Sequence, residues 1–239
     1  PYRRQRQMCI RDRPNYTRYG GVSISYADGD ASYSRGSGDN HSRAMNFYVT
    51  EMGNKGHYLD VVLRFHHMDT NFKMFDENGK KIRGDMHNVG ISLSSEYGRK
   101  KMIDDKGWYI EPQGQLTLGY LGGDNYTTSN GIAVRQGGIR SALGRIGFNL
   151  GKDIDEKTNI YLKANLLHEF GGGYHAAMTD SSGSRIKIDR SFKDTWFEYG
   201  IGAAIQTGTN NHVYLDFERS AGGDFKKDWS WNVGARWTF

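Results

Sequence analysis

The chain has 239 residues, of which 36% are hydrophobic, and its mean hydropathy is −0.74. No stretch approaches the roughly 18 uninterrupted apolar residues of a transmembrane helix, which excludes a helical membrane protein. Aromatic residues make up 13% of the chain, with 32 glycines and only 3 prolines. Disordered chains are poor in aromatic residues, so this composition favours strands and turns.

The formal net charge of +5 is concentrated at the N-terminus. Residues 1–13 (PYRRQRQMCIRDR) hold five arginines against one aspartate, which leaves +1 for the rest of the chain. They also hold Cys9, the single cysteine, and a cysteine-free remainder suits passage through an oxidising periplasm. The string resembles a translated sequencing adapter. We therefore treat 1–13 as a non-native or disordered segment, expect one domain over 14–239, and assign no nucleic-acid partner.

About ten segments of 14–239 alternate between apolar and polar residues. In the third of them, Leu63 and Phe65 alternate with Arg64 and His66. Successive side chains of a strand point to opposite faces, so each segment predicts a strand with one apolar and one polar face. In chain order the segments are 18–28, 43–50, 57–67, 87–97, 107–120, 145–150, 160–169, 197–205, 213–218 and 229–239.

The last segment, 229–239, shows the alternation most clearly. Its odd positions run from Trp229 to Phe239 and are all apolar, whereas its even positions are small or polar. Ten steps of about 3.3 Å, tilted by about 40°, give a height of roughly 25 Å, which matches the apolar band of an outer-membrane barrel. A barrel with a wet lumen needs only half of each strand to be apolar, which explains the low mean hydropathy.

The connections between these segments alternate in length. Long connections on one side and short turns on the other are typical of an up-and-down barrel in the outer membrane. We therefore predict an all-β, antiparallel, up-and-down transmembrane β-barrel in the bacterial outer membrane. The long polar gaps are 29–42, 68–86, 121–138 and 171–191, and the short ones are 51–56, 98–106, 151–158 and 206–211, before a compact final loop at 221–226.

Several motifs occur in an order and at a spacing that are specific to one family. They are 56–60 (GHYLD), 108–113 (WYIEPQ), 144–151 (GRIGFNLG), 161–170 (YLKANLLHEF), 194–200 (DTWFEYG) and 218–226 (ERSAGGDFK), with the terminal strand. On these residues the chain resembles the translocator barrel of monomeric autotransporters, which belong to type V secretion. The resemblance covers about 18–239. It implies a barrel of twelve strands with a helix in its lumen, so the chain, with about ten strands and no helix, is expected to be incomplete at its N-terminal end.

The resemblance also implies a function and partners. The domain would be the outer-membrane pore and anchor that exports an N-terminal passenger, absent here, to the cell surface. Outer-membrane lipid and the barrel-assembly machinery would be its other partners. The terminal strand would carry the signal for that machinery, on Phe239, Trp237, Val233 and Trp231. A small porin, a loop-mediated adhesin and a barrel enzyme are the alternatives.

The charged residues of the polar faces are expected to line the lumen, where a wet pore holds both signs of charge hydrated or paired. This set is Arg64, Glu96, Glu111, Arg145, Lys163, Glu169, Glu198, Asp216, Glu218 and Arg236. We predict no catalytic residues, no cofactor and no metal site. His66 and His67 are adjacent in a strand, so they point to opposite faces and cannot together hold one ion.

Overall fold

The computed structural model describes residues 9–13, 16–208, 211–224 and 226–237. These residues form strands and turns and contain no helix, so no helix there is long and apolar enough to cross a membrane. All strand pairs are antiparallel, and neighbours along the chain are neighbours in the main sheet. The predicted up-and-down arrangement is confirmed.

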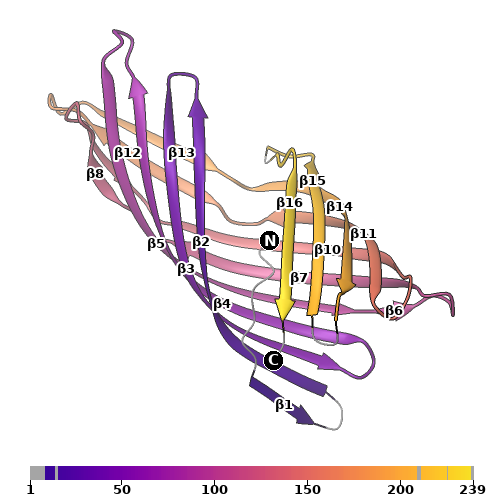
Figure 1. The fold of residues 1–239 in the computed structure, drawn as a ribbon. Helices are drawn as coiled ribbons and strands as arrows, with labels where there is room; N and C mark the ends of the chain where they lie inside the picture. The colour runs from indigo at the N-terminus through magenta and orange to yellow at the C-terminus, as the bar shows by residue number, and fades with distance from the viewer. Residues whose placement is uncertain (1–8, 14–15, 209–210, 225, 238–239) are drawn as a thin grey trace.

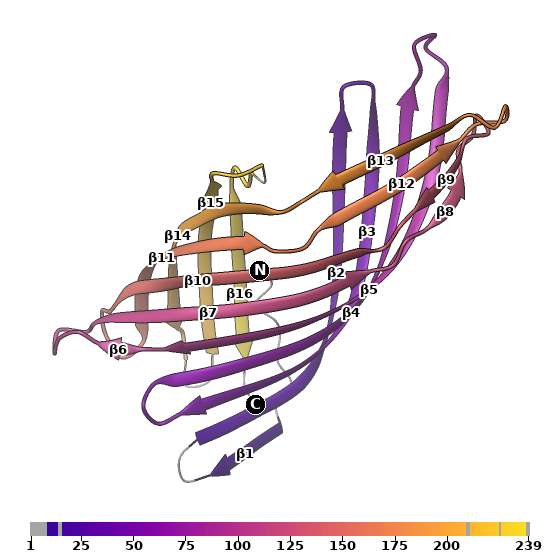
Figure 2. The same cartoon turned by 180° about the vertical axis from the view of Figure 1, so that it is seen from behind.

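The main sheet has 12 strands and curls into a trough (Figures 1 and 2). Each predicted segment coincides with one of its long strands, although 107–120 begins one residue before its strand, 229–239 also begins one residue early, and residues 238–239 lie outside the described residues. In order across the sheet the strands are β1 (Cys9–Arg13), β2 (Tyr16–Tyr33), β3 (Gly36–Gly53), β4 (His57–Phe75), β5 (Lys81–Arg99), β7 (Trp108–Leu121), β10 (Ile139–Asp153), β11 (Thr158–Glu169), β14 (Asp194–Gln206), β15 (Asn211–Ala221) and β16 (Ser230–Trp237), while the short β6 (Lys101–Met102) pairs with β7.

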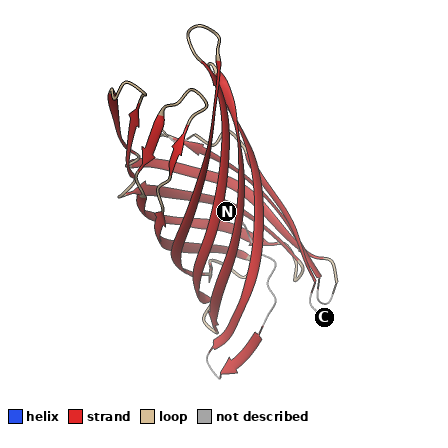
Figure 3. Ribbon diagram, turned by 90° about the vertical axis from the view of Figure 1, so that its left-hand side faces the viewer, coloured by secondary structure: helices blue, strands red, loops and turns tan. Residues whose placement is uncertain are grey.

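The two ends of the sheet, β1 and β16, do not pair with each other within the described residues. Figure 3 shows the strands slanting around the curl. Ten of the 12 strands are long, which agrees with the expected number of about ten, and the other two are the short β1 and β6. Residues 9–13 form β1, with Cys9 opposite Gly20 and Arg13 opposite Tyr16. That 1–13 lie outside the natural domain stays a prediction.

The prediction of long loops is wrong for two of the four long gaps. Most of 29–42 and 68–86 is strand, because β2 and β3 run on to a turn at 34–35 and β4 and β5 run on to a turn at 76–80. These hairpins project beyond the rest of the sheet at one end (Figure 1). On the face that continues the apolar band their outer parts are polar, as with Asp69, Asn71 and Lys73 in β4, since outside the bilayer that face does not have to be apolar. The apolar alternation therefore ends before the strands do.

The other two long gaps contain a second sheet at the same end of the molecule. It has four antiparallel strands, in the order β13-β12-β9-β8. The long connections thus carry extended, hydrogen-bonded structure away from the main sheet (Figure 2). Their bounds are β8 (Asn125–Thr127), β9 (Ala133–Gln136), β12 (Gly173–Thr179) and β13 (Arg185–Ser191).

The turn between β4 and β5 sets the register of the longest hairpin. The Asp76 carboxylate accepts the backbone N–H groups of Asn78 (2.9 Å) and Lys80 (2.8 Å). Gly79 takes φ of 76°, a left-handed conformation that a residue with a Cβ adopts at a cost, and its N–H donates to the Asp76 carbonyl at 3.1 Å. From this turn the pairing runs without a break from Phe75 opposite Lys81 to His57 opposite Arg99.

Candidate functional site

The two faces of the main sheet have the reverse of the burial found in a soluble protein. Phe65 is 43% exposed, Leu162 56%, Ile201 54% and Trp231 70%. By contrast, the polar residues Asn46, Thr50, Asn88, Asn149 and Asn165 are buried. A soluble sheet hides its apolar face in a core, whereas a membrane barrel turns that face to lipid. The expected apolar outer face is therefore present, and no dry core gathers these side chains.

Ion pairs on the opposite face, which we call the polar face, join strands that are not neighbours. Arg145 of β10 donates to Glu96 of β5 at 2.8 Å, across β7. Lys163 of β11 reaches Asp216 of β15 at 3.2 Å, across β14. Neighbouring strands are about 4.8 Å apart, so such contacts form where side chains converge, on the inner side of a curved sheet. The polar face is the concave one.

The densest cluster of charge on the polar face lies on β11, β14 and β15. Lys163 also pairs with Glu218, and Lys227, from the connection between β15 and β16, bridges Glu198 (3.1 Å) and Glu218 (3.3 Å). The Tyr161 hydroxyl donates to Asp216 at 2.5 Å. Asp216 and Glu218 are both buried. Buried charges are tolerated when each has a partner and hydrogen bonds, and that condition is met here.

The remaining residues of the expected set are distributed along the same face. Glu111 accepts hydrogen bonds from Gln113 (2.8 Å) and Asn149 (3.1 Å). Glu169, at the outer end of β11, accepts the Ser141 hydroxyl at 2.6 Å. Arg64 lies in β4 opposite Asn46 and Ser92. The side chain of Arg236 lies outside the described residues.

A repeated tyrosine–glycine pairing was not predicted from the sequence. In each pair a tyrosine lies directly opposite a glycine, and a Cβ on that glycine would meet the ring at 2.1–2.6 Å. The glycines therefore leave room for rings that lie flat on the neighbouring strand. The pairs are Tyr58–Gly98, Tyr109–Gly151, Tyr161–Gly202 and Tyr214–Gly234.

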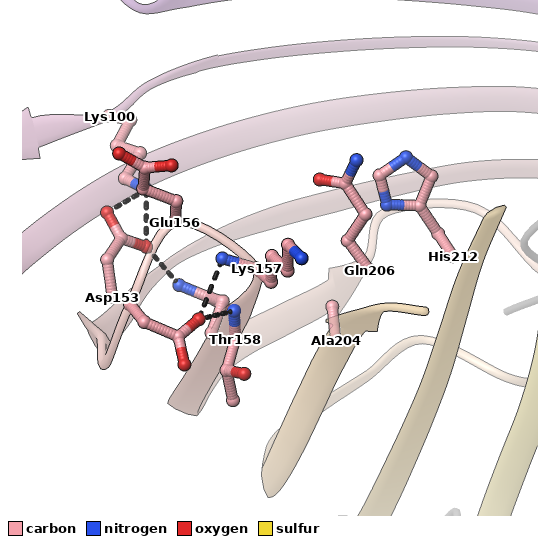
Figure 4. A pocket seen from close by; sticks show the side chains of 10 residues that line it. Lys100, Asp153, Glu156, Lys157, Thr158, Ala204, Gln206 and His212 are labelled. Carbon is pink, nitrogen blue, oxygen red and sulfur yellow. Dashed lines mark hydrogen bonds and ion pairs between the residues drawn. The ribbon is translucent and has the colours of Figure 1, made fainter. Parts of the chain in front are cut away.

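A hollow of about 510 Å³ lies at the short-turn end of the polar face (Figure 4). Lys100 donates to Asp153 at 2.8 Å, and Asp153 also accepts from Asn159 at 2.6 Å. Asp155 accepts the backbone N–H groups of Lys157 and Thr158, and these bonds hold the pKa of its carboxyl below the usual value. The Asp153 carboxylate thus serves an ion pair and the Asp155 carboxylate serves the turn, so the hollow has the character of an ordered pore rim.

The terminal strand β16 pairs with β15 along its length, from Ser230 opposite Glu218 to Trp237 opposite Asn211. Trp231 and Val233 are exposed on the apolar face, as its alternation predicts. Phe239 and the side chain of Trp237 lie outside the described residues. The strand is therefore available at one edge of the sheet, since no further strand pairs with β16 in the described chain.

Comparison with known proteins identifies the family of this sheet, whose apolar face is exposed and whose polar face is concave. The model of the autotransporter beta-domain family matches residues 12–218. The chain belongs to this family. Such domains lie in the bacterial outer membrane as translocator barrels, which confirms the resemblance, the fold class and the location that the sequence predicts.

Pertactin autotransporter of Bordetella parapertussis is 31% identical over an alignment of 226 residues that covers 92% of this chain and 24% of the relative. Probable autotransporter YcgV of Escherichia coli is 29% identical over 226 residues, covering 92% and 23%. The autotransporter chain thus spans about a quarter of the length of these relatives.

Among solved structures, the beta domain of the Bordetella autotransporter BrkA matches with a TM-score of 0.74 and 25% identity, covering 93% of this chain and 84% of that one. The translocator domain of NalP from Neisseria meningitidis matches with a TM-score of 0.68 at 12% identity, covering 92% and 73%, and supports the fold alone.

Proposed function

We propose that this autotransporter domain anchors a passenger in the outer membrane and forms the conduit through which that passenger reaches the cell surface. The observation that carries the proposal is the concave polar face, on which charges of both signs are paired across strands. Such a wall stays hydrated and holds few unpaired charges that would trap a moving polypeptide. The residues given above as the expected lumenal set would form it.

The conduit needs no cofactor and catalyses no reaction. It would act only as a barrier, because the curved wall excludes lipid while an extended chain passes along it. A small porin or a loop-mediated adhesin would use the same barrel, but family membership favours translocation. Its partners would be lipid around the apolar face, the barrel-assembly machinery and its own passenger.

The test uses the longest natural chain that contains this domain, with an epitope in the segment upstream of it. Antibody labelling of intact cells is expected to detect that epitope, and external protease is expected to remove it. Labelling after permeabilisation controls for expression. An epitope that stays inside cells whose barrel is correctly inserted would overturn the conduit function, whereas the anchor would still stand.

We also propose that β16 is the element recognised by the assembly machinery, through Phe239, Trp237, Val233 and Trp231. The support is the exposure of Trp231 and Val233 on an edge strand without a second partner in the described chain. Deletion of Phe239 is expected to reduce the amount of inserted barrel severalfold, measured by heat-modifiable migration in gels. Deletion of the exposed Ser182 in the turn between β12 and β13 is the matched control. Equal insertion of both variants would contradict this role.

A further inference from the structure

Three side chains on the projecting β4–β5 hairpin form a cluster that the translocation function does not use. The Asp69 carboxylate lies 2.9 Å from His67 Nε2 and 2.7 Å from His87 Nδ1. One ligand atom of each residue lies within 4.8 Å of the other two. The two imidazole rings are nearly parallel, with 16° between their planes and 6.4 Å between their centres.

The register of the hairpin explains why these residues meet. His67 and Asp69 are two residues apart in β4 and so share a face, and His87 lies directly opposite Asp69 in β5. Phe65 precedes them on the same face, so the cluster follows the apolar band on the outer side of the wall, toward the 76–80 turn. The side chains of His67, Asp69 and His87 are 46%, 27% and 63% exposed.

We propose that His67, Asp69 and His87 form a binding site for a transition-metal dication, with Zn²⁺ as the best fit. Two imidazole nitrogens and one carboxylate oxygen are ligands that zinc commonly takes, with bonds near 2.0–2.2 Å. Their separations require only small side-chain rotations around an ion placed between them. Imidazole also suits Ni²⁺ and Cu²⁺, whereas Ca²⁺ and Mg²⁺ prefer sites made of oxygen ligands.

The surrounding charges are compatible with a dication. Asp69 and His87 continue a row across β2 to β5 that begins with Asp28 and His41, each opposite the next. The His41 ring contacts the Asp28 carboxylate, so it is directed to that residue and not to the cluster.

Two further groups flank the cluster. The Asp124 carboxylate accepts the backbone N–H of His87 at 2.7 Å and adds negative charge next to the site. Arg43 of β3 lies opposite His67, and its positive charge offsets part of that negative charge. The exposed side would be completed by water or by an outside ligand.

A bound ion would join β4 to β5 beyond the membrane and ahead of the turn. It would therefore resist separation of the two strands where no lipid supports them. Binding to the folded state alone raises stability in proportion to the logarithm of metal concentration over the dissociation constant. This consequence can be measured without any export assay.

The experiment uses the folded chain in detergent, without an affinity tag, titrated with ZnCl₂ by calorimetry. One equivalent is expected to bind, and thermal unfolding is expected to shift upward with zinc. His67→Gln and His87→Gln, made separately, are each expected to weaken zinc binding more than about 10-fold. The reason is that mutating a residue that only hydrogen-bonds to a metal ligand already lowers metal affinity by about 10-fold. CaCl₂ serves as the oxygen-preferring probe and is expected not to bind at this site.

The matched control is His175→Gln. His175 is also an exposed histidine beside a carboxylate, at 2.5 Å from Asp189, but among the described residues no second histidine joins that pair. Its substitution is expected to leave zinc affinity unchanged. Absence of zinc binding by the parent chain would overturn the proposal, as would unchanged affinity in both cluster variants. Because each variant changes one exposed polar residue, heat-modifiable migration verifies that it folds.

Discussion

At the level of single residues, the polar face depends on a few charges with several partners each. Lys163 is the clearest case, because its ammonium lies between Asp216 and Glu218 and its side chain is only 13% exposed. Lys227 shares Glu218, but its other partner is Glu198. Removing Lys163 would leave two buried carboxylates facing each other with less counter-charge, and like charges in a low-dielectric site repel strongly.

Lys163→Met is therefore expected to lower the free energy of unfolding by about 3 kcal/mol, the lower end of the range for removing one partner of a buried ion pair. Urea-dependent unfolding followed by tryptophan fluorescence would measure it. Lys193→Met, at an exposed position outside the main sheet, is the control and is expected to change little. Equal midpoints for the two variants would show that lumenal water already screens the pair.

At the level of strands, side-chain shape fixes how neighbours fit. Tyr161 of β11 is buried against Gly202 of β14, which stands directly opposite. A Cβ at Gly202 would lie 2.3 Å from the ring, too close for the tyrosine to keep its place. Moving the ring would also break the bond from its hydroxyl to Asp216.

Gly202→Ala is expected to destabilise the domain by about 1–3 kcal/mol, the usual cost of overpacking. The temperature at which the heat-modifiable band disappears would report the loss. Gly114→Ala in β7 provides the comparison, because a Cβ there would have nothing within 4 Å. If Gly202→Ala behaves like Gly114→Ala, the tyrosine ring is not held against the glycine.

At the level of the whole molecule, the medium around the apolar face decides the effect of a surface charge. Leu162 on β11 and Ile186 on β13 are both exposed aliphatic residues, 56% and 65% respectively. Leu162 lies on the apolar face of the main sheet, whereas Ile186 lies in the second sheet beyond it. In water the two would tolerate a charge equally well.

Leu162→Arg is expected to cost about 2–4 kcal/mol of stability in bilayers, the penalty for arginine near the membrane midplane of a barrel. Ile186→Arg is expected to be near neutral. Folding into vesicles across a urea series would give both values. A similar small effect at both positions would place Leu162 in water and contradict the orientation of the sheet.

The strands, their two faces and the family could be read from the sequence, because alternation with a period of two reports the face of each residue without knowledge of its neighbours. The outer ends of β2 to β5 could not, since beyond the bilayer the face that continues the apolar band is polar and its alternation stops. The pairing of Arg145 with Glu96 also required the structure, because it depends on curvature that brings second-neighbour strands together.

The cluster of His67, Asp69 and His87 was missed because His67 was considered with its neighbour His66. The turn at 76–80 already implies the register that places His87 opposite Asp69, but only the folded hairpin brings three ligand atoms to one point.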